Sequence, residues 1–253
     1  MKLDLNLLDI TLTKALEQAC ENDIIILKSN YTYFEKIVLD KPNITLIGDN
    51  SIVEFNACHS DLNENGVKYG TTGSSTFRVL KNGHGFKAIN VTFINSHKRS
   101  KDAQNQAVAF KSECDNVILE NSKFISCQDT LYFDEGKNVV VNNCYITGDV
   151  DFIFGSADAT FTNCIIEACN HSVAYYTAPS TYESNKQGFL FDNCTFLSKC
   201  ANTYLGRWWY PGGAKELVMP KITFNNCKFQ KDIKMEMLQM HDKDPNRGKL
   251  EIK

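Results

Sequence analysis

The sequence predicts an all-β fold: a right-handed, single-stranded parallel β-helix with a short capping helix at its N-terminal end. Two features of the 253 residues predict it. A pattern of alternating apolar residues around an asparagine appears six times, at spacings of 20 to 33 residues. Coils of about 20 residues with variable loops, stacked about 4.8 Å apart, are what a parallel β-helix requires. An amphipathic segment precedes the first copy of the pattern.

That first segment is the predicted helix. Its apolar residues recur at helical spacing, namely at Leu12, Ala15, Leu16, Ala19 and Cys20. Asp9 or Thr11 stands where an N-cap is expected. Because a β-helix has an open apolar end, we expect this helix to cover it.

The repeated pattern supplies the strands. Residues 139–146 read V-V-V-N-N-C-Y-I, with apolar period two on each side of the second asparagine and a slip of one residue there. Period two indicates strands, and asparagine tolerates the left-handed conformation that a corner between two strands needs. We expect these asparagines to form a ladder and the cysteines after them an interior stack. The asparagines are Asn90, Asn121, Asn143, Asn163, Asn193 and Asn226.

One alternative architecture and one segment outside the repeat have to be considered. A β-sandwich would show hairpin turn pairs at regular spacing, which the sequence lacks. Residues 232–253 are charged and lack the repeat, so we expect a loose or partly helical tail outside the coils. The prediction is therefore one domain over residues 1–253, with that tail attached.

Composition excludes several classes of protein. A net charge of −3 gives no basic field for nucleic acid, and no run of about 18 apolar residues predicts a membrane span. The first residues lack an apolar export signal, so we expect a cytoplasmic protein, or a secreted one whose signal was removed or is atypical. The ten cysteines include no C-x-x-C pair, and we expect them to be mostly buried free thiols rather than zinc ligands. We expect a monomer.

The repeat also predicts where two carboxylates meet. Asp129 lies eight residues after Asn121, and Asp151 lies eight residues after Asn143. Equivalent positions on adjacent coils are about 5 Å apart between backbones. Two aspartates so close cannot both ionise easily, so one pKa should rise and the other stay low. Such a pair provides a protonated acid beside an ionised nucleophile or base.

Two glutamines fall on the same stripe. Gln106 and Gln128 are 22 residues apart, which matches the step between the two corners above. Their carboxamides can donate hydrogen bonds to a developing oxyanion. The set of two aspartates and two glutamines therefore suits acyl transfer at an ester.

At these residues the chain resembles the pectin methylesterase family, through about residue 213. Residues 106–110 (Q-A-V-A-F), 128–132 (Q-D-T-L-Y), 151–155 (D-F-I-F-G) and 205–209 (L-G-R-W-W) resemble its Q-A-V-A-L, Q-D-T-L-Y, D-F-I-F-G and L-G-R-P-W motifs. Weaker matches lie at residues 33–35, 44–49 and 71–77. Their order along the chain is the family's order.

The resemblance implies a role for each residue of the stripe. Asp151 would be the nucleophile, and Asp129 the general acid that protonates methanol and then the base that activates water. Gln106 and Gln128 would hold the oxyanion, and Arg207 would keep Asp151 ionised and oriented. Neither a metal nor an organic cofactor is implied.

The resemblance also implies the substrate, methyl-esterified polygalacturonate, and the residues that bind it. Trp209 would offer a flat face to a sugar ring. The other expected substrate-binding residues are Tyr132, Phe154, Val150 and Thr76. The chain departs from the family at Trp208, where the family has proline, at Tyr31, where it has glycine, and in lacking the C-terminal G-W-x-x-W segment.

Three rival functions stay open at this point. Paired carboxylates also suit a retaining glycosidase, and the same fold carries polysaccharide lyases. A related esterase or thioesterase acting on a small intracellular molecule is the second rival. The third is a carbohydrate-binding protein without activity, which the joint presence of both aspartates, both glutamines and Arg207 disfavours.

Overall fold

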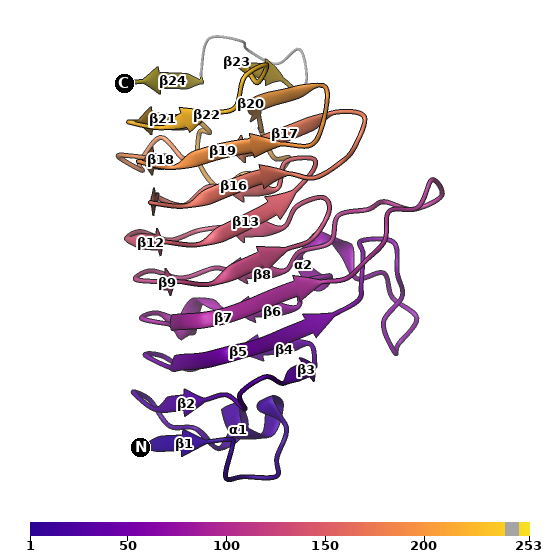
Figure 1. The fold of residues 1–253 in the computed structure, drawn as a ribbon, viewed down its shortest axis with the longest axis vertical. Helices are drawn as coiled ribbons and strands as arrows, with labels where there is room; N and C mark the ends of the chain where they lie inside the picture. Colours follow the sequence, from indigo (N-terminus) through magenta and orange to yellow (C-terminus); the bar gives the residue numbers. More distant parts are fainter. Residues whose placement is uncertain (241–247) are drawn as a thin grey trace.

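The computed structural model describes residues 1–240 and 248–253. Its strands pair in parallel, coil on coil, in two sheets that run the length of the molecule (Figure 1). The chain enters at one end of the stack and leaves at the other, so position along the sequence is also height along the solenoid.

The larger sheet has 16 strands and bends at the asparagine corners. Its strands are β1 (Lys2–Asp4), β2 (Ile24–Ile26), β3 (Thr32–Phe34), β5 (Thr45–Phe55), β7 (Lys87–Asn95), β9 (Ile118–Glu120), β10 (Lys123–Ile125), β12 (Val139–Asn142), β13 (Tyr145–Gly148), β15 (Ala159–Thr162), β16 (Ile165–Ala168), β18 (Phe189–Asp192), β19 (Thr195–Ser198), β21 (Lys221–Asn225), β22 (Lys228–Phe229) and β24 (Lys249–Ile252).

The smaller sheet has eight strands and carries the candidate site. Its strands are β4 (Ile37–Leu39), β6 (Phe77–Val79), β8 (Phe110–Ser112), β11 (Leu131–Phe133), β14 (Ile153–Gly155), β17 (Ala174–Pro179), β20 (Thr203–Trp208) and β23 (Lys234–Gln239). The remaining elements are the helices α1 (Leu12–Gln18) and α2 (Gly70–Gly73) and the 3-10 turn η1 (Lys81–Gly83).

The corners follow the predicted chemistry. All six repeat asparagines have positive φ, between 50° and 58°. The Asn143 amide donates to the Asn121 side-chain oxygen at 2.6 Å, and Asn193 donates to Asn163 at 2.6 Å. The left-handed backbone is thus combined with a side-chain hydrogen bond to the next coil, which confirms the expected ladder at these steps.

The interior is apolar and continuous from coil to coil. Stacked phenylalanines fill it, as in the pair Phe93 and Phe124, whose ring centroids are 5.5 Å apart. Cys144, Cys164 and Cys194 are buried in this core, which confirms the predicted interior stack, and all ten cysteines are free thiols.

The N-terminal helix lies at the predicted end of the stack, as Figure 1 shows. Thr11 is its N-cap and accepts a hydrogen bond from the Lys14 N–H at 3.1 Å. Leu12, Ala15 and Leu16 are buried in the main core. Cys20 was expected on the same apolar face, but the helix ends before it and its side chain is exposed.

The expectation for the C-terminal tail was wrong. β23 pairs with β20, and β24 pairs with β21, so residues 234–239 and 249–252 extend both sheets. β24 and β23 are thus the last strands of the larger and of the smaller sheet. The part of the tail at residues 241–247 lies outside the described residues, and the division into one domain stays a prediction. Neither helix in the described part of the chain has the length and apolar character of a membrane span.

Candidate active site

The two aspartates lie on adjacent coils, as predicted. Leu131 of β11 is paired with Ile153 of β14, and the Asp129 N–H donates to the Val150 carbonyl oxygen at 3.1 Å. Asp129 and Asp151 both have positive φ, 65° and 53°, and are 7% and 6% exposed. Both line one cleft of about 300 Å³ outside the smaller sheet.

The two glutamines lie beside them. Gln106 and Gln128 form a parallel bridge between neighbouring coils, and both side chains line the same cleft. Gln128 also lowers the pKa of Asp129, against the larger effects of burial and Asp151, which raise it. Four polar side chains from three coils therefore converge on one space, as their spacing in the sequence predicted.

Arg207, in β20, is bonded to Asp151. Its Nε donates to one carboxylate oxygen at 3.0 Å and its Nη2 donates to the other. The guanidinium also lies over the Tyr175 ring, 4.4 Å from its centroid. A bidentate contact fixes both the charge and the plane of the carboxylate.

Burial dominates the ionisation of both acids. It raises the pKa of Asp129 well above its ordinary value, and the neighbouring Asp151 raises it further. Burial also raises the pKa of Asp151, although Arg207 opposes this. The expected rise in pKa is thus found at Asp129. The pKa of Asp151 was expected to stay low and does not, because desolvation outweighs the effect of Arg207. Arg207 bonds the Asp151 carboxylate, which favours ionisation of Asp151 over Asp129, the order that a nucleophile and an acid require.

Aromatic side chains form one wall of the cleft. The Tyr132 and Phe154 rings are stacked with centroids 4.0 Å apart, and Trp209 lies 5.6 Å from Phe154. Ala178 and Met240 pack against the same group and also line the cleft. Such a surface suits the apolar face of a sugar ring.

Two of the expected substrate-binding residues are not brought into the cleft. Thr76 is fully buried, and its hydroxyl donates to the Ile94 carbonyl oxygen at 2.9 Å. Val150 is half-buried and does not line the cleft. Its carbonyl oxygen accepts the Asp129 backbone N–H.

Thr71 and Thr72 line the cleft in place of Thr76. They come from the same T-T-G-S-S-T-F segment, but the short helix α2 turns its first threonines outward. Lys111, a buried lysine, donates to the Thr72 hydroxyl at 2.8 Å and lies 4.3 Å from the centroid of the Tyr132 ring. Nothing in the repeat distinguished this lysine from other strand residues, so its contact with two cleft residues emerges only from the structure.

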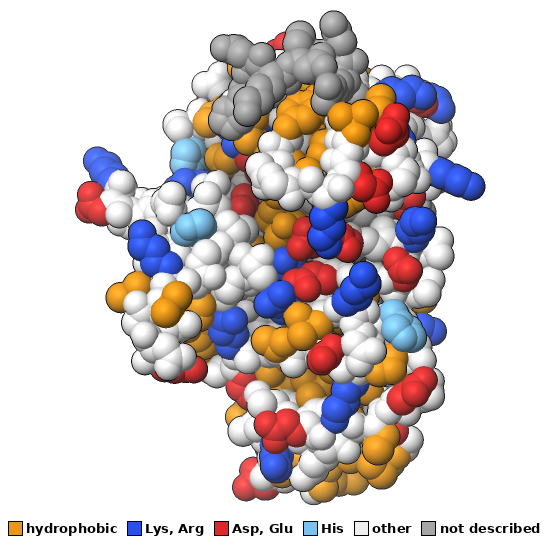
Figure 2. Space-filling model, turned by 180° about the vertical axis from the view of Figure 1, so that it is seen from behind, with side chains coloured by type: hydrophobic (Ala, Val, Ile, Leu, Met, Phe, Trp, Pro, Cys, Tyr) orange, Lys and Arg blue, Asp and Glu red, His pale blue; other side chains and the backbone are white. Residues whose placement is uncertain are grey.

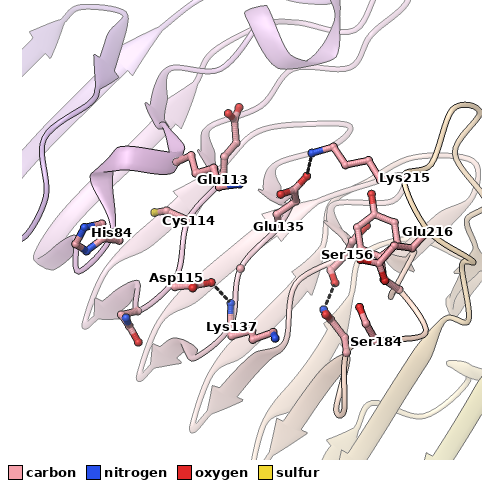
Figure 3. A pocket seen from close by; sticks show the side chains of 15 residues that line it. His84, Glu113, Cys114, Asp115, Glu135, Lys137, Ser156, Ser184, Lys215 and Glu216 are labelled. Carbon is pink, nitrogen blue, oxygen red and sulfur yellow. Dashed lines mark hydrogen bonds and ion pairs between the residues drawn. The ribbon is translucent and has the colours of Figure 1, made fainter.

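Charged side chains of both signs are interspersed with apolar ones along the face seen in Figure 2. A second cavity, of about 520 Å³, is lined by charged side chains of both signs, among them Glu135, Lys137 and Lys215 (Figure 3). Lys215 pairs with Glu135, and the Asp115 carboxylate accepts the Lys137 N–H at 2.7 Å. The charge of Glu135 is paired with a lysine there, whereas the smaller cleft holds two carboxyl groups with raised pKa values, that of Asp129 raised well above its ordinary value, so the smaller cleft is the candidate site.

One group in the described part of the chain has side chains of metal-binding type. Ligand atoms of Cys58, Asp61 and His97 lie within 4.8 Å of one another. Two of the three ligand groups already have partners: the Asp61 carboxylate accepts the Cys58 backbone N–H at 2.7 Å, and the His97 ring bonds Asn105 at 3.0 Å. This group lies in the loops after β5 and β7 and contributes no residue to the cleft.

Comparison with known proteins identifies the family to which the chain belongs. The family model described as Pectinesterase matches residues 8–222. Probable pectinesterase 49 of Arabidopsis thaliana is 33% identical over 202 residues, which cover 78% of this chain and 54% of that protein. A pectinesterase of Ralstonia solanacearum is 40% identical over 143 residues, 50% of this chain and 36% of that protein. The chain thus spans about half or less of the length of these two relatives.

Solved structures agree in fold. A pectin methylesterase from Yersinia enterocolitica superimposes with a TM-score of 0.76 at 28% identity, over 88% of this chain and 80% of that one. A pectin methylesterase in complex with a hexasaccharide matches with a TM-score of 0.79 at 24% identity, over 90% and 76%. At that identity the second match shows the parallel β-helix and nothing more.

Proposed function

Because the chain belongs to the pectinesterase family, we propose that it is a carboxylic ester hydrolase that removes methyl esters from galacturonate units of pectin and releases methanol. The observation that carries this proposal is the pair of buried carboxylates on adjacent coils beside two carboxamides, with Arg207 bonded to one carboxylate only. That asymmetry divides the two acids into a nucleophile and a proton carrier.

In the first half-reaction the ionised Asp151 attacks the ester carbonyl carbon. The carbonyl oxygen gains negative charge, and the Gln106 and Gln128 carboxamides donate to it. The bond to the methoxy group then breaks while protonated Asp129 gives its proton to the leaving oxygen. Methanol departs, and an acyl group stays on Asp151 as a mixed anhydride.

In the second half-reaction Asp129 is ionised and accepts a proton from water. The resulting hydroxide attacks the acyl carbon, the bond to Asp151 breaks, and a galacturonic acid carboxyl group is formed, which loses its proton to solvent and leaves as the carboxylate. Asp129 is protonated again and Asp151 is ionised again, so the site returns to its starting state. The cleft of about 300 Å³ is at the lower end of ligand-site volumes, which suits the reacting sugar with its polymer neighbours outside.

The aromatic wall supports a sugar substrate. Trp209 is half-buried and forms one side of the cleft with Tyr132 and Phe154. These residues would hold the ring while the acids act on its ester group.

The test is the product analysis of methylated polygalacturonate incubated with the protein. We expect methanol release with no shortening of the polymer and no unsaturated sugar. Shortened chains would favour the glycosidase, unsaturated ends the lyase, and hydrolysis of small esters with none of pectin the small-molecule esterase. Unmethylated polygalacturonate serves as the substrate control.

A further inference from the structure

An ion pair outside the groups described so far lies next to Gln128. Arg99, in the loop after β7, donates from Nε to Asp149 Oδ2 at 2.9 Å and from Nη2 to Oδ1 at 2.6 Å. The Asp149 side chain is 3% exposed and that of Arg99 is 28% exposed. A bidentate pair with a buried carboxylate holds the guanidinium in one plane.

The same guanidinium reaches the candidate oxyanion site. Arg99 Nη2 also donates to Gln128 Oε1, at 3.3 Å. A guanidinium has only N–H donors, so Gln128 must turn its oxygen toward Arg99 and its NH2 group away from it. Gln128 also lowers the pKa of Asp129, as a neighbouring N–H donor would, although burial and Asp151 outweigh it.

The orientation matters because a carboxamide has two unlike ends. An oxyanion is stabilised by the NH2 group and repelled by the carbonyl oxygen. Gln128 can therefore assist the reaction in only one of its two flipped orientations.

The backbone ties this pair to the nucleophile. Asp149 precedes Asp151 by two residues, its N–H donates to the Cys127 carbonyl oxygen at 2.9 Å, and its own carbonyl accepts the Tyr175 N–H at 2.9 Å. The turn that carries the nucleophile is thus also the turn that anchors Arg99.

We propose that Arg99, held by Asp149, is a positioning residue that fixes the Gln128 carboxamide with its NH2 group toward the reacting ester. The proposal rests on the ester hydrolysis proposed above. Arg99 acts through Gln128 and touches neither the nucleophile nor the acid.

Removal of Arg99 should therefore lower kcat. One oxyanion donor is worth about 10²–10³-fold in kcat, and a misoriented Gln128 loses part of that. We expect Arg99→Ala to lower kcat by about 10–100-fold. KM should change by less than about threefold, because the ground-state ester carries no negative charge on its oxygen.

A double-mutant cycle separates positioning from general damage. Arg99→Ala, Gln128→Ala and the double variant are compared with the wild type by methanol release. If Arg99 acts through Gln128, Arg99→Ala costs less than about twofold when Gln128 is already alanine. The same loss in both backgrounds would overturn the proposal.

Removing Arg99 alone leaves the buried Asp149 without its cation. Arg99→Ala is therefore also made together with Asp149→Asn, which removes the uncompensated charge, and thermal unfolding is recorded for each variant. Lys199→Ala, which breaks an ion pair with Glu167 in which the lysine is exposed, is the matched control and should keep wild-type activity.

A second measurement does not depend on the substrate. It follows the side-chain NH2 signals of Gln128 in NMR spectra, which are assigned by their disappearance in the Gln128→Ala variant. These signals should shift or merge in the Arg99→Ala/Asp149→Asn variant and keep their positions in Lys199→Ala. Unchanged resonances in the former would overturn the positioning role even if the wild type proved inactive on pectin. An active wild type with an additive cycle would overturn the positioning role and leave the proposed function intact.

Discussion

Removal of the Arg207 guanidinium should cost both stability and activity. The side chain of Asp151 is 8% exposed and receives two hydrogen bonds from Arg207. Arg207→Ala leaves this carboxylate buried without its cation, and breaking such a pair costs about 3–5 kcal/mol. For a chain of this size each kcal/mol lowers Tm by about 2–4 °C, so we expect a decrease of about 6–20 °C at neutral pH.

The activity of Arg207→Ala should recover in part at higher pH. Burial already raises the pKa of Asp151, and Arg207 is the group that opposes this. Without it the nucleophile ionises only at higher pH, so the acidic limb of the pH–rate profile moves upward. Arg207→Lys restores the charge but offers no planar fork, so it should return the profile toward the wild type at a lower rate.

The assays are thermal unfolding followed by circular dichroism and methanol release across a pH series. Lys199→Ala is the control, because its pair with Glu167 is exposed on the lysine side and is worth about 0–1 kcal/mol. A change in Tm for Arg207→Ala no larger than that of the control, with an unmoved pH profile, would refute the reasoning.

Three further predictions concern the acid, the corners and the thiols. The pKa of Asp129 is raised in the folded protein, so this group makes wild-type stability fall as pH rises from its unfolded pKa near 3.9 through its folded pKa. Asp129→Asn should therefore abolish methanol release and flatten this fall in stability. An unchanged slope of Tm against pH in the variant would contradict the prediction. Asn143→Ala should cost about 1–2 kcal/mol more than Asn143→Gly in chemical denaturation, because φ is 52° there, whereas equal costs would show that the left-handed corner is not the cause. At about pH 8 a thiol reagent should label the exposed Cys20 first. Cys164 and Cys194, whose pKa values are raised to about 12, should be labelled only on unfolding, and their fast labelling in the native protein would count against the interior stack.

The fold could be predicted because each coil has to solve the same problem. The asparagine corner needs a positive φ, and asparagine is one of the few residues that adopts it, so the requirement is visible in the sequence as a repeat. Counting from Asn121 and Asn143 then placed Asp129 and Asp151 on adjacent coils. The same counting placed Gln106 beside Gln128.

The rest depends on side-chain directions and on contacts between distant segments. Thr76 was expected in the cleft but points to the Ile94 carbonyl, while the neighbouring helix α2 presents Thr71 and Thr72 instead. The pair of Arg99 with Asp149 joins residues 50 apart, and no spacing in the sequence relates them.

The terminal coil was missed for a related reason. Residues 234–239 carry no asparagine corner, so the repeat gave no sign that they pair with β20. Their pairing satisfies backbone groups of β20, and that requirement belongs to the sheet rather than to the local sequence.

The claim that two carboxylates on adjacent coils perform ester hydrolysis is tested most directly by methanol release from methylated polygalacturonate by the wild type and by Asp151→Ala. We predict release by the wild type and none above background by the variant, with circular dichroism showing both folded. Comparable release by a folded Asp151→Ala would contradict the assignment of the nucleophile and, with it, the proposed mechanism.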